Sequence, residues 1–292
     1  GAVPPFGFVI DYLTYGGLYR EVWLETTAET RCTDLFVHTP KGTQADITLK
    51  VENPRLAAVL QVSVKTLEGE TLALRKLLPE AQNHVLLDVP EAAPWTLEAP
   101  RLYVCAAELL DGEGKVLDSR EARFGFRKAE FKPDGFYLNG KKTFLRGLNR
   151  HQSFPYIGYA APERLQREDA RILKEELSCN AVRTSHYPQS QHFVDACDEL
   201  GLLVFTELPG WQHIGDENWK DLACKMLEEM ILQYRNHPSI VLWGVRINES
   251  VDDDAFYTRT NRIAHSLDPS RATSGVRYLE KSSLLEDVYA YN

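Results

Sequence analysis

Four stretches of the sequence carry polar or ionisable side chains directly after a short apolar run: Arg146–His151, Arg183–Pro188, Thr206–Trp211 and Trp243–Ser250. Carboxyl groups with imidazoles and amides nearby are the residue types that transfer protons in enzymes. If the apolar runs are parallel strands of one sheet, their carboxyl ends meet at one rim and bring these groups together. The spacing therefore predicts an acid–base site at that rim.

Glu249 is the candidate catalytic carboxylate, because it follows the buried run Ile240–Val245 and has Asn248 beside it. His151 and His186 come from two other strand ends and are candidate binding side chains. Each of them also has a structural alternative. A carboxylate such as Glu249 stabilises a helix N-terminus, and either histidine can be a hydrogen-bonded structural residue. The remaining histidines have no supporting constellation.

Three further side chains are candidates for substrate binding. Glu207 ends the third run, where it can be a metal ligand or a structural partner of Asn248; we expect the structural role. Trp211 and Trp243 are either core aromatics or platforms for the apolar C–H surface of a sugar. The acidic run Asp252–Asp254 has the composition of a metal cluster, but we expect it to cap the next helix. No metal site is predicted.

Two halves of the chain have different periodicities. Residues 1–130 contain short alternating runs separated by turn residues, which is typical of an antiparallel sandwich. A hairpin is expected where Asp111–Gly114 separates two such runs. The predicted strands are Val22–Thr27, Leu35–His38, Asp46–Glu52, Val59–Thr66, His84–Val89 and Leu102–Leu109.

From about residue 136 strands and helices alternate, which predicts a parallel sheet, either doubly wound or a (β/α)8 barrel. Five or six strands fit, so a barrel would be truncated. The predicted strands are Thr143–Leu148, Ala181–Ser185, Leu202–Thr206, Ile240–Val245, Ala272–Val276 and Val288–Tyr289. The predicted helices are Pro162–Leu177, Gln191–Leu200, Leu222–Gln233 and Asp253–Leu267.

Composition excludes several classes of protein. The 292 residues include 33 basic and 42 acidic side chains, a net charge of −9, so a nucleic-acid partner is not expected. No apolar run is long enough to cross a membrane, and the first residues do not resemble a signal peptide. The five cysteines are scattered without a C-x-x-C pair, which favours buried, reduced thiols and a cytoplasmic location.

Six motifs, in this order along the chain, resemble glycoside hydrolase family 2, whose members include β-galactosidases, β-glucuronidases and β-mannosidases. They are Tyr15–Val22, Phe124–Arg127, Phe136–His151, Asn180–Pro188, Cys197–Gly201 and Asn236–Trp243. The resemblance implies an immunoglobulin-like β-sandwich followed by a truncated (β/α)8 TIM barrel. It implies the tail of a sugar-binding jelly roll at 1–20, the sandwich at 21–128 and the first part of the barrel at 129–292.

The resemblance also implies roles for particular residues. Glu249 matches the acid/base of the family, Asn248 matches the residue that contacts the sugar 2-hydroxyl, and His151 and His186 match residues that line the sugar pocket. Arg246 stands before the pair where many members have a small residue, a departure that bears on the substrate. The family's nucleophile ends a seventh strand, beyond Asn292.

The sequence therefore predicts a fragment of a retaining β-glycoside hydrolase, most similar to a β-galactosidase, that is inactive alone. β-Glucuronidase or β-mannosidase specificity is one alternative, and a non-catalytic carbohydrate-binding or scaffold module is another. A dehydrogenase is set aside because no G-x-G-x-x-G motif follows a strand. The expected partner is a β-galactoside. The sequence requires no cofactor, and a divalent or monovalent cation in the intact parent stays open. The exposed edges and uncovered apolar face of an incomplete barrel predict either self-association into a homo-oligomer or a collapsed open sheet.

Overall fold

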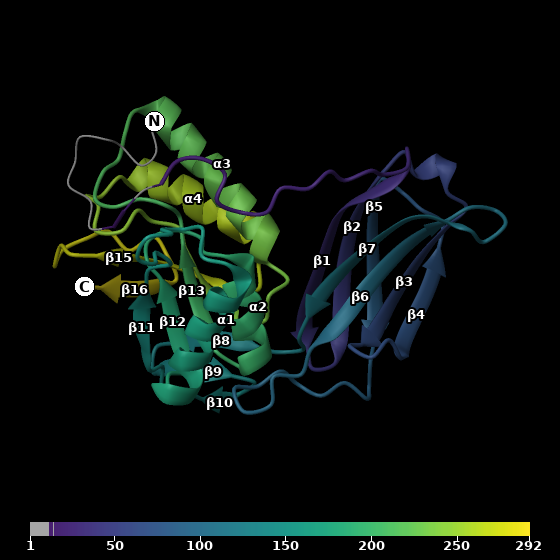
Figure 1. Ribbon diagram of the computed structural model, residues 1–292, viewed down its shortest axis with the longest axis horizontal. Coiled ribbons are helices and arrows are strands. Elements are labelled where there is room, and N and C mark those ends of the chain that lie inside the picture. The colour runs from purple at the N-terminus through teal and green to yellow at the C-terminus, as the bar shows by residue number, and fades with distance from the viewer. Residues whose placement is uncertain (1–11, 14) are drawn as a thin grey trace. The chain divides into compact units, whose positions relative to one another are not determined.

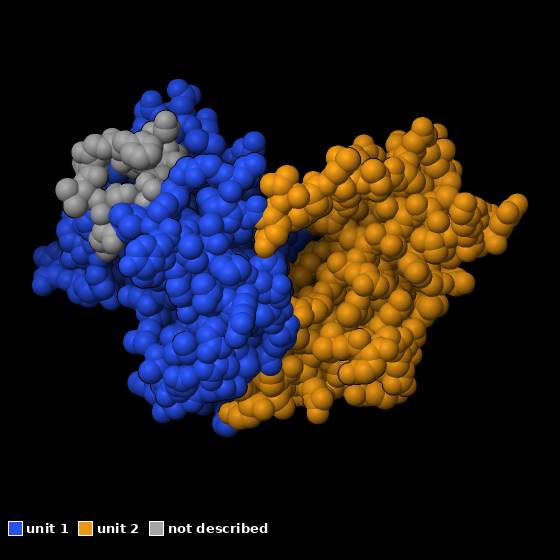
Figure 2. All heavy atoms as spheres, viewed as in Figure 1, with its two compact units in different colours: residues 1–20, 129–235, 239–292 blue, residues 21–128, 236–238 orange. Residues whose placement is uncertain are grey.

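The computed structural model describes residues 12–13 and 15–292 (Figure 1). The chain divides into two compact units (Figure 2). The β-unit consists of Glu21–Lys128 with Asn236–Pro238, and the α/β-unit consists of the described residues up to Arg20 with Ala129–Arg235 and Ser239–Asn292. Of the expected jelly-roll tail at 1–20, residues 1–11 and 14 lie outside the described part of the chain.

The β-unit is a sandwich of two antiparallel sheets. One sheet has the strand order β1-β2-β5 and the other the order β4-β3-β6-β7. The strands are β1 (Arg31–Lys41), β2 (Gln44–Glu52), β3 (Val59–Thr66), β4 (Thr71–Leu77), β5 (Gln82–Asp88), β6 (Tyr103–Leu110) and β7 (Val116–Phe124), with a 3₁₀ turn at Pro54–Leu56. This two-sheet arrangement is that of an immunoglobulin-like domain.

Alternating burial explains why these segments form strands. In β5 every second side chain is buried, so one face of the strand packs on the core. The predicted hairpin around Asp111–Gly114 is confirmed, since β6 and β7 pair in antiparallel register on either side of it. The edge strand β4 was not predicted, because no residue of it is fully buried and the residues that pack on the core, Leu72, Ala73 and Leu77, do not alternate regularly.

The predicted strand Val22–Thr27 is wrong. These residues have no regular secondary structure, and none of them pairs with a strand in the described structure. Leu24 is 91% exposed, and Trp23 is also largely exposed. A run with strand-forming composition becomes a strand only where a partner and a core face are available.

The α/β-unit begins with a small antiparallel sheet of order β10-β9-β8, followed by a six-stranded sheet of order β11-β12-β13-β14-β15-β16. The small sheet contains β8 (Ala129–Lys132), β9 (Gly135–Leu138) and β10 (Lys141–Lys142). The strands of the large sheet are β11 (Gly147–Arg150), β12 (Ala181–Thr184), β13 (Leu203–Glu207), β14 (Ile240–Gly244), β15 (Ala272–Arg277) and β16 (Val288–Tyr291).

Every neighbouring pair in the large sheet is parallel, and the strands lie in sequence order. A doubly wound sheet reverses its strand order at a switch point, whereas a (β/α)8 barrel does not. Of the two predicted topologies, the described sheet therefore fits the first part of a barrel.

Helices connect these strands and pack on the sheet through a shared apolar core. They are α1 (Glu163–Arg171), which continues as a π-helical turn Ile172–Glu176, then α2 (Gln191–Leu200), α3 (Glu217–Tyr234) and α4 (Asp254–Leu267). The side chains of Asp216 and Asp253 cap α3 and α4, and Gly201 ends α2 in the left-handed conformation with a φ of 71°.

The first strand of the large sheet begins later than predicted, at Gly147 instead of Thr143. The Asn180 amide accepts a hydrogen bond from the backbone N–H of Arg146 (2.7 Å) and donates one to the carbonyl of Phe144 (2.8 Å). The Asn180 side chain thus binds the backbone N–H of Arg146 and the carbonyl of Phe144, which would otherwise be available for strand pairing.

All five cysteines are buried as free thiols. Among the described helices, none is both long enough and apolar enough to cross a membrane.

Candidate active site

The predicted site residues come from the carboxyl ends of four adjacent strands. His151 follows β11, His186 follows β12, Glu207 ends β13, and Asn248 and Glu249 follow β14. Because the strands are parallel neighbours, their carboxyl ends lie at one rim of the sheet.

Arg183, on β12, holds the centre of this rim. Its Nε donates to Glu207 Oε1 (2.7 Å), and its Nη2 contacts Glu207 Oε2 (3.0 Å), Asn248 Oδ1 (2.6 Å) and His186 Nδ1 (3.0 Å). One planar guanidinium therefore fixes the positions of side chains from three strands. We call Arg183, His186, Glu207 and Asn248 the rim cluster.

Both carboxylate oxygens of Glu207 are engaged inside the rim cluster. Oε2 also contacts His186 Nδ1 at 3.2 Å, and the side chain is almost fully buried. A carboxylate bound by a fork of guanidinium N–H groups orients its neighbours more readily than it binds a metal ion. The geometry therefore favours the structural role that the sequence predicted for Glu207.

Aromatic rings gather beside the two histidines. The rings of His151 and His186 lie 5.5 Å apart, and the Tyr12 ring lies 5.9 Å from His151 and 6.1 Å from His186. The Tyr187 hydroxyl contacts His151 Nδ1 at 3.2 Å, and burial raises the pKa of that hydroxyl. His151 is exposed and His186 is buried, so the pair forms a surface that is open on one side.

Asn248 and Trp211 each present a buried donor. Asn248 Oδ1 is bound to Arg183, but in the described part of the chain its Nδ2 has no acceptor. The Trp211 indole nitrogen is also buried without an acceptor among the described residues. The two residues pair across neighbouring segments in a single parallel bridge. Buried donors without partners are costly unless a ligand or water accepts from them.

Glu249 is half-buried and has an unusual backbone, with a φ of 53°. Its N–H donates to the carbonyl of Val276 at 2.8 Å. Its carboxylate accepts from Gln212 Nε2 at 3.2 Å and from Asn292 Nδ2 at 2.5 Å. Glu249 is the carboxylate of the site that is both held by hydrogen bonds and accessible, as an acid/base must be.

Trp243 lies outside the rim cluster. Its ring is fully buried in the core between sheet and helices, and its indole N–H donates to Asp268 Oδ2 at 2.9 Å. The Arg271 guanidinium lies over the ring. A tryptophan enclosed in this way has no free face for a sugar, so we leave it out of the proposed site.

The acidic run before α4 divides between two tasks. Asp253 caps the helix, accepting from the N–H of Phe256 at 3.0 Å. Asp252 turns the other way and forms an ion pair with Arg246. The capping prediction therefore describes Asp253 and not Asp252.

Three residues at or near the site, Arg183, Gln212 and Arg246, were not among the predicted site residues. Arg183 and Arg246 stand in the strand-end motifs, so their position was a signal. Gln212 follows Trp211 and carried no signal of its own. The side chain of Arg246 has no exposed surface and packs on the Tyr257 ring, so it does not reach the rim cluster as a substrate contact.

Comparison with known proteins places the chain in a family. The model for the TIM-barrel domain of glycosyl hydrolases family 2 matches residues 129–290, and a second model of glycosyl hydrolases family 2 matches residues 25–127. The chain belongs to glycosyl hydrolase family 2.

Individual family 2 proteins are similar over nearly all of the chain. A β-galactosidase of Thermoanaerobacterium thermosulfurigenes is 48% identical over 99% of this chain and 42% of its own length. The structure of an FMN-binding β-glucuronidase from Facaelibacterium prausnitzii L2-6 is similar with a TM-score of 0.87 and 29% identity, over 98% of this chain and 48% of the other. The apo structure of β-glucuronidase 3 of Bacteroides uniformis is similar with a TM-score of 0.82 and 34% identity, over 97% of this chain and 37% of the other.

The chain thus spans less than half the length of these family 2 relatives. What it contributes is the sandwich, the first strands of the barrel and one rim of polar side chains with an accessible carboxylate.

Proposed function

We propose that the full-length protein containing this chain is a retaining β-glycoside hydrolase that acts on β-galactosides, with Glu249 as its acid/base. The observation that carries the proposal is the position of Glu249. Its carboxylate is accessible and hydrogen-bonded, and it directly follows Asn248 of the rim cluster.

In a retaining mechanism two carboxyl groups lie about 5–5.5 Å apart on either side of the scissile bond. Glu249 would protonate the departing glycosidic oxygen while the second carboxylate attacks the anomeric carbon. Glu249, now ionised, would then take a proton from the water that releases the sugar. The nucleophile belongs to a later strand of the full-length protein.

The two glutamates nearest the end of this chain, Glu280 and Glu286, do not fit the nucleophile's role. Glu286 is buried and paired with Arg277, so it has no access to substrate. Glu280 is exposed and lies on a loop after β15. The 292-residue chain is therefore expected to be inactive by itself. Turnover of a nitrophenyl β-galactoside by this chain, abolished in Glu249→Gln, would contradict that.

The other rim residues would bind the sugar. The free N–H of Asn248 Nδ2 would donate to a ring hydroxyl, while the Arg183 contact holds its amide in place. The imidazoles of His151 and His186 would accept or donate to further hydroxyls on the open side. The buried Trp211 N–H offers one more donor.

The acid/base role predicts a specific kinetic pattern in the full-length protein. Glu249→Gln should lower kcat/KM for phenyl β-galactoside by about 10²–10⁴-fold, because the poor leaving group needs a proton. The same variant should hydrolyse 2,4-dinitrophenyl β-galactoside far better, because this leaving group departs as an anion. Added azide needs no general base to attack the glycosyl-enzyme in place of water. It should therefore restore turnover of this substrate, and the product should be a galactosyl azide.

Glu280→Gln is the matched control, since it removes an exposed carboxylate from a nearby loop. It should leave both substrates unaffected. If Glu249→Gln hydrolyses phenyl β-galactoside at the wild-type rate, Glu249 is not the acid/base.

Substrate specificity has two candidates. The name of the relative at 48% identity favours galactosides, whereas the two similar solved structures are named as β-glucuronidases. Parallel assays with nitrophenyl β-galactoside, β-glucuronide and β-mannoside distinguish them. Sugar binding by calorimetry without hydrolysis of any of the three, lost in His186→Ala, would favour a non-catalytic binding protein.

A further inference from the structure

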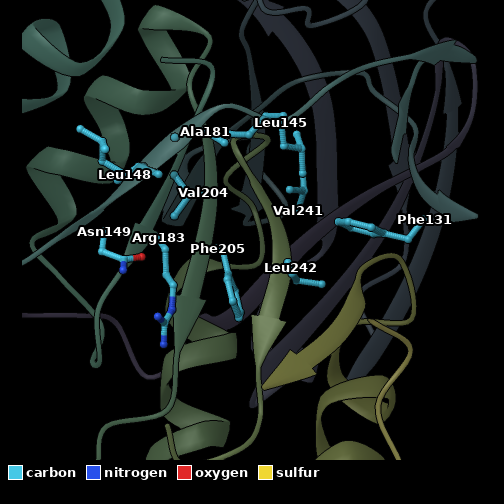
Figure 3. A pocket seen from close by; sticks show the side chains of 13 residues that line it. Phe131, Leu145, Leu148, Asn149, Ala181, Arg183, Val204, Phe205, Val241 and Leu242 are labelled. Atoms are coloured by element: carbon cyan, nitrogen blue, oxygen red, sulfur yellow. The ribbon is translucent and has the colours of Figure 1, made fainter. Parts of the chain in front are cut away.

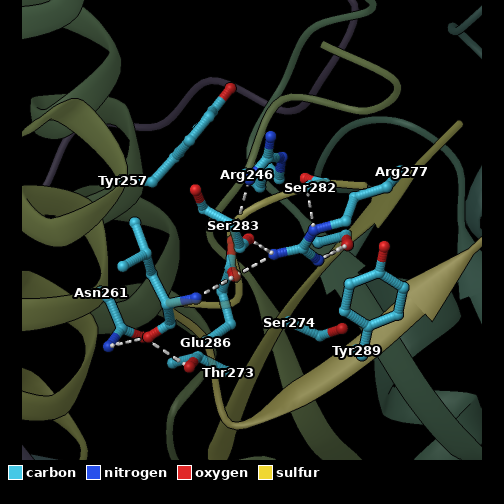
Figure 4. Close-up of polar contacts among 12 residues, drawn as sticks. Arg246, Tyr257, Asn261, Thr273, Ser274, Arg277, Ser282, Ser283, Glu286 and Tyr289 are labelled. Carbon is cyan, nitrogen blue, oxygen red and sulfur yellow. Dashed lines mark hydrogen bonds and ion pairs between the residues drawn. The ribbon is translucent and has the colours of Figure 1, made fainter. Parts of the chain in front are cut away.

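An ion-pair network joins the loop that carries Glu249 to the loop after β15 and to β15 itself (Figure 4). Its charged members are Arg246, Asp252, Arg277 and Glu286, which we call the clamp. The side chains of Arg246 and Glu286 have no exposed surface. None of these groups has a part in the proposed chemistry.

The first contact of the clamp closes the loop on itself. Arg246 Nη2 donates to Asp252 Oδ1, so the two ends of the segment 246–252 are joined, with Glu249 at its midpoint. The Arg246 guanidinium also lies 4.3 Å from the centre of the Tyr257 ring, on α4. The Tyr257 hydroxyl in turn contacts Ser250 Oγ at 2.5 Å. The side chains on both sides of Glu249 are thereby fixed to the body of the unit.

The second set of contacts ties this closed loop to the next one. Asp252 accepts from Ser282 Oγ (2.6 Å) and from the N–H of Ser283 (3.0 Å). Burial works against ionisation of Asp252, but these hydrogen bonds and the Arg246 guanidinium keep its pKa below the usual value. The loop after β14 and the loop after β15 are therefore joined through the Asp252 carboxylate.

The third set anchors both loops to strand β15. Arg277 donates to Ser282 Oγ (3.0 Å), to the carbonyl of Ser283 (2.8 Å) and to Glu286. It also donates to the carbonyl of Gly275 at 2.7 Å. The neighbouring carbonyl on β15, that of Val276, accepts the N–H of Glu249. The contacts of the clamp thus lead back, through β15, to the backbone of Glu249.

The backbone of Glu249 is in the left-handed conformation, which needs support from its surroundings. A residue with a side chain is rarely stable at a positive φ such as 53°, and such a conformation persists only where the surroundings impose it. Buried charges are themselves costly unless they are paired. The clamp places buried, paired charges around one loop whose strained residue would otherwise relax.

We propose that the clamp consists of positioning residues that hold Glu249 in the orientation for proton transfer, with Arg246 and Asp252 as its essential pair. The inference rests on the proposed acid/base role of Glu249. Without the clamp, the loop backbone would relax toward a negative φ and carry the carboxyl away from the glycosidic oxygen. The defect would therefore concern protonation of the leaving group, and sugar binding at the rim cluster would persist.

The test measures how kcat/KM of the full-length protein depends on the leaving group, using aryl β-galactosides from phenyl to 2,4-dinitrophenyl. A displacement of a reacting group by about 1 Å can cost about 100-fold in rate. Arg246→Met should lower kcat/KM for the phenyl substrate by about 10–100-fold. The dinitrophenyl substrate, which needs no proton, should lose less than about threefold, so the plot against leaving-group pKa becomes steeper.

Arg271→Met is the matched control. Arg271 is also buried and paired, with Asp268 and the carbonyl of Ile240, but it directly precedes β15, at the end of the strand away from the rim. Its loss should reduce stability and leave the leaving-group dependence unchanged. If Arg246→Met fails to fold, Asp252→Asn answers the same question, because Asp252 is partly exposed.

The outcomes separate the two proposals. If Glu249→Gln shows no leaving-group dependence, the proposed function fails. If Glu249→Gln shows it, but Arg246→Met and Asp252→Asn lose activity equally on all substrates or not at all, the clamp is merely structural and the inference is overturned.

Discussion

The role of a side chain at this site depends on the face of the strand from which it projects as much as on its residue type. Arg183 and Val182 are consecutive on β12, yet one side chain reaches the rim cluster and the other joins the core. The sequence shows that an arginine ends the strand region. It does not show that this guanidinium binds partners from two further strands, because those distances depend on the register of the sheet.

The same alternation bears on Trp243, for which the sequence left a core role and a sugar platform open. Its side chain lies in the core, where it meets Asp268 and Arg271, and this arrangement favours the core role. Asp268 is fully buried and also accepts from Ser270. Burial opposes its ionisation, while Arg271 and these hydrogen bonds lower its pKa below the usual 3.8.

Replacing this carboxylate should affect stability in a pH-dependent way. Asp268→Asn should lower the free energy of unfolding by about 3 kcal/mol at pH 7, because it removes the carboxylate that forms an ion pair with the buried Arg271. A lowered folded-state pKa contributes stability that is complete above pH 3.8 and is lost as the pH falls through the folded value. The difference between wild type and variant should therefore shrink in acid.

Urea unfolding at pH 7 and pH 3 measures this difference. Asp221→Asn is the control, since Asp221 forms an exposed pair with Arg259 and its loss should cost less than about 0.5 kcal/mol. An equal effect of Asp268→Asn at both pH values would contradict the assigned pKa direction.

At the scale of elements, the helices and the buried parallel strands were the most predictable part of the chain. The helix Gln191–Leu200 was predicted with its observed bounds, because Gly201 marks its end clearly. The strands Val22–Thr27 and Thr143–Leu148 were misplaced, since pairing partners and the Asn180 side chain decide those segments. Local sequence cannot reveal contacts made by residues distant in the chain.

Close approach between strands also constrains particular positions. A Cβ at Gly244, on β14, would lie 2.7 Å from Glu207 Cγ and 2.9 Å from Glu207 Cα. Gly244→Ala should therefore push β13 away, destabilising the unit by about 1–3 kcal/mol. Thermal unfolding measures the loss. Gly16→Ala, where a Cβ meets nothing within 4 Å, should be nearly neutral; equal losses would mean that the contact with Glu207 is not the cause.

At the scale of the whole molecule, the alternation of strands and helices predicted a parallel sheet but not which of two topologies it has. The consecutive order of the described strands decided this.

The sheet bears a groove of about 220 Å³, whose lining includes Leu148, Arg183, Phe205 and Leu242 (Figure 3). Leu148, on β11, is 51% exposed.

We expect the 292-residue chain to self-associate in solution, because apolar side chains and the pairing groups of β11 are exposed together. Sedimentation velocity over about a hundredfold range of concentration should show a rising average mass. Leu148→Lys should oppose this association, whereas Leu177→Lys, at an exposed leucine away from the groove, should not. A monomer at every concentration would contradict the expectation.

Because the backbone of Glu249 is left-handed, selection for stability and selection for catalytic turnover favour different residues at this position. Glycine adopts that conformation without strain and asparagine tolerates it better than glutamate does, but neither can transfer a proton. A screen that rewards heat resistance alone would therefore favour replacing the very residue proposed to perform the reaction. Lineages that keep glutamate here would be expected to do so under selection for turnover, at some cost in thermal tolerance.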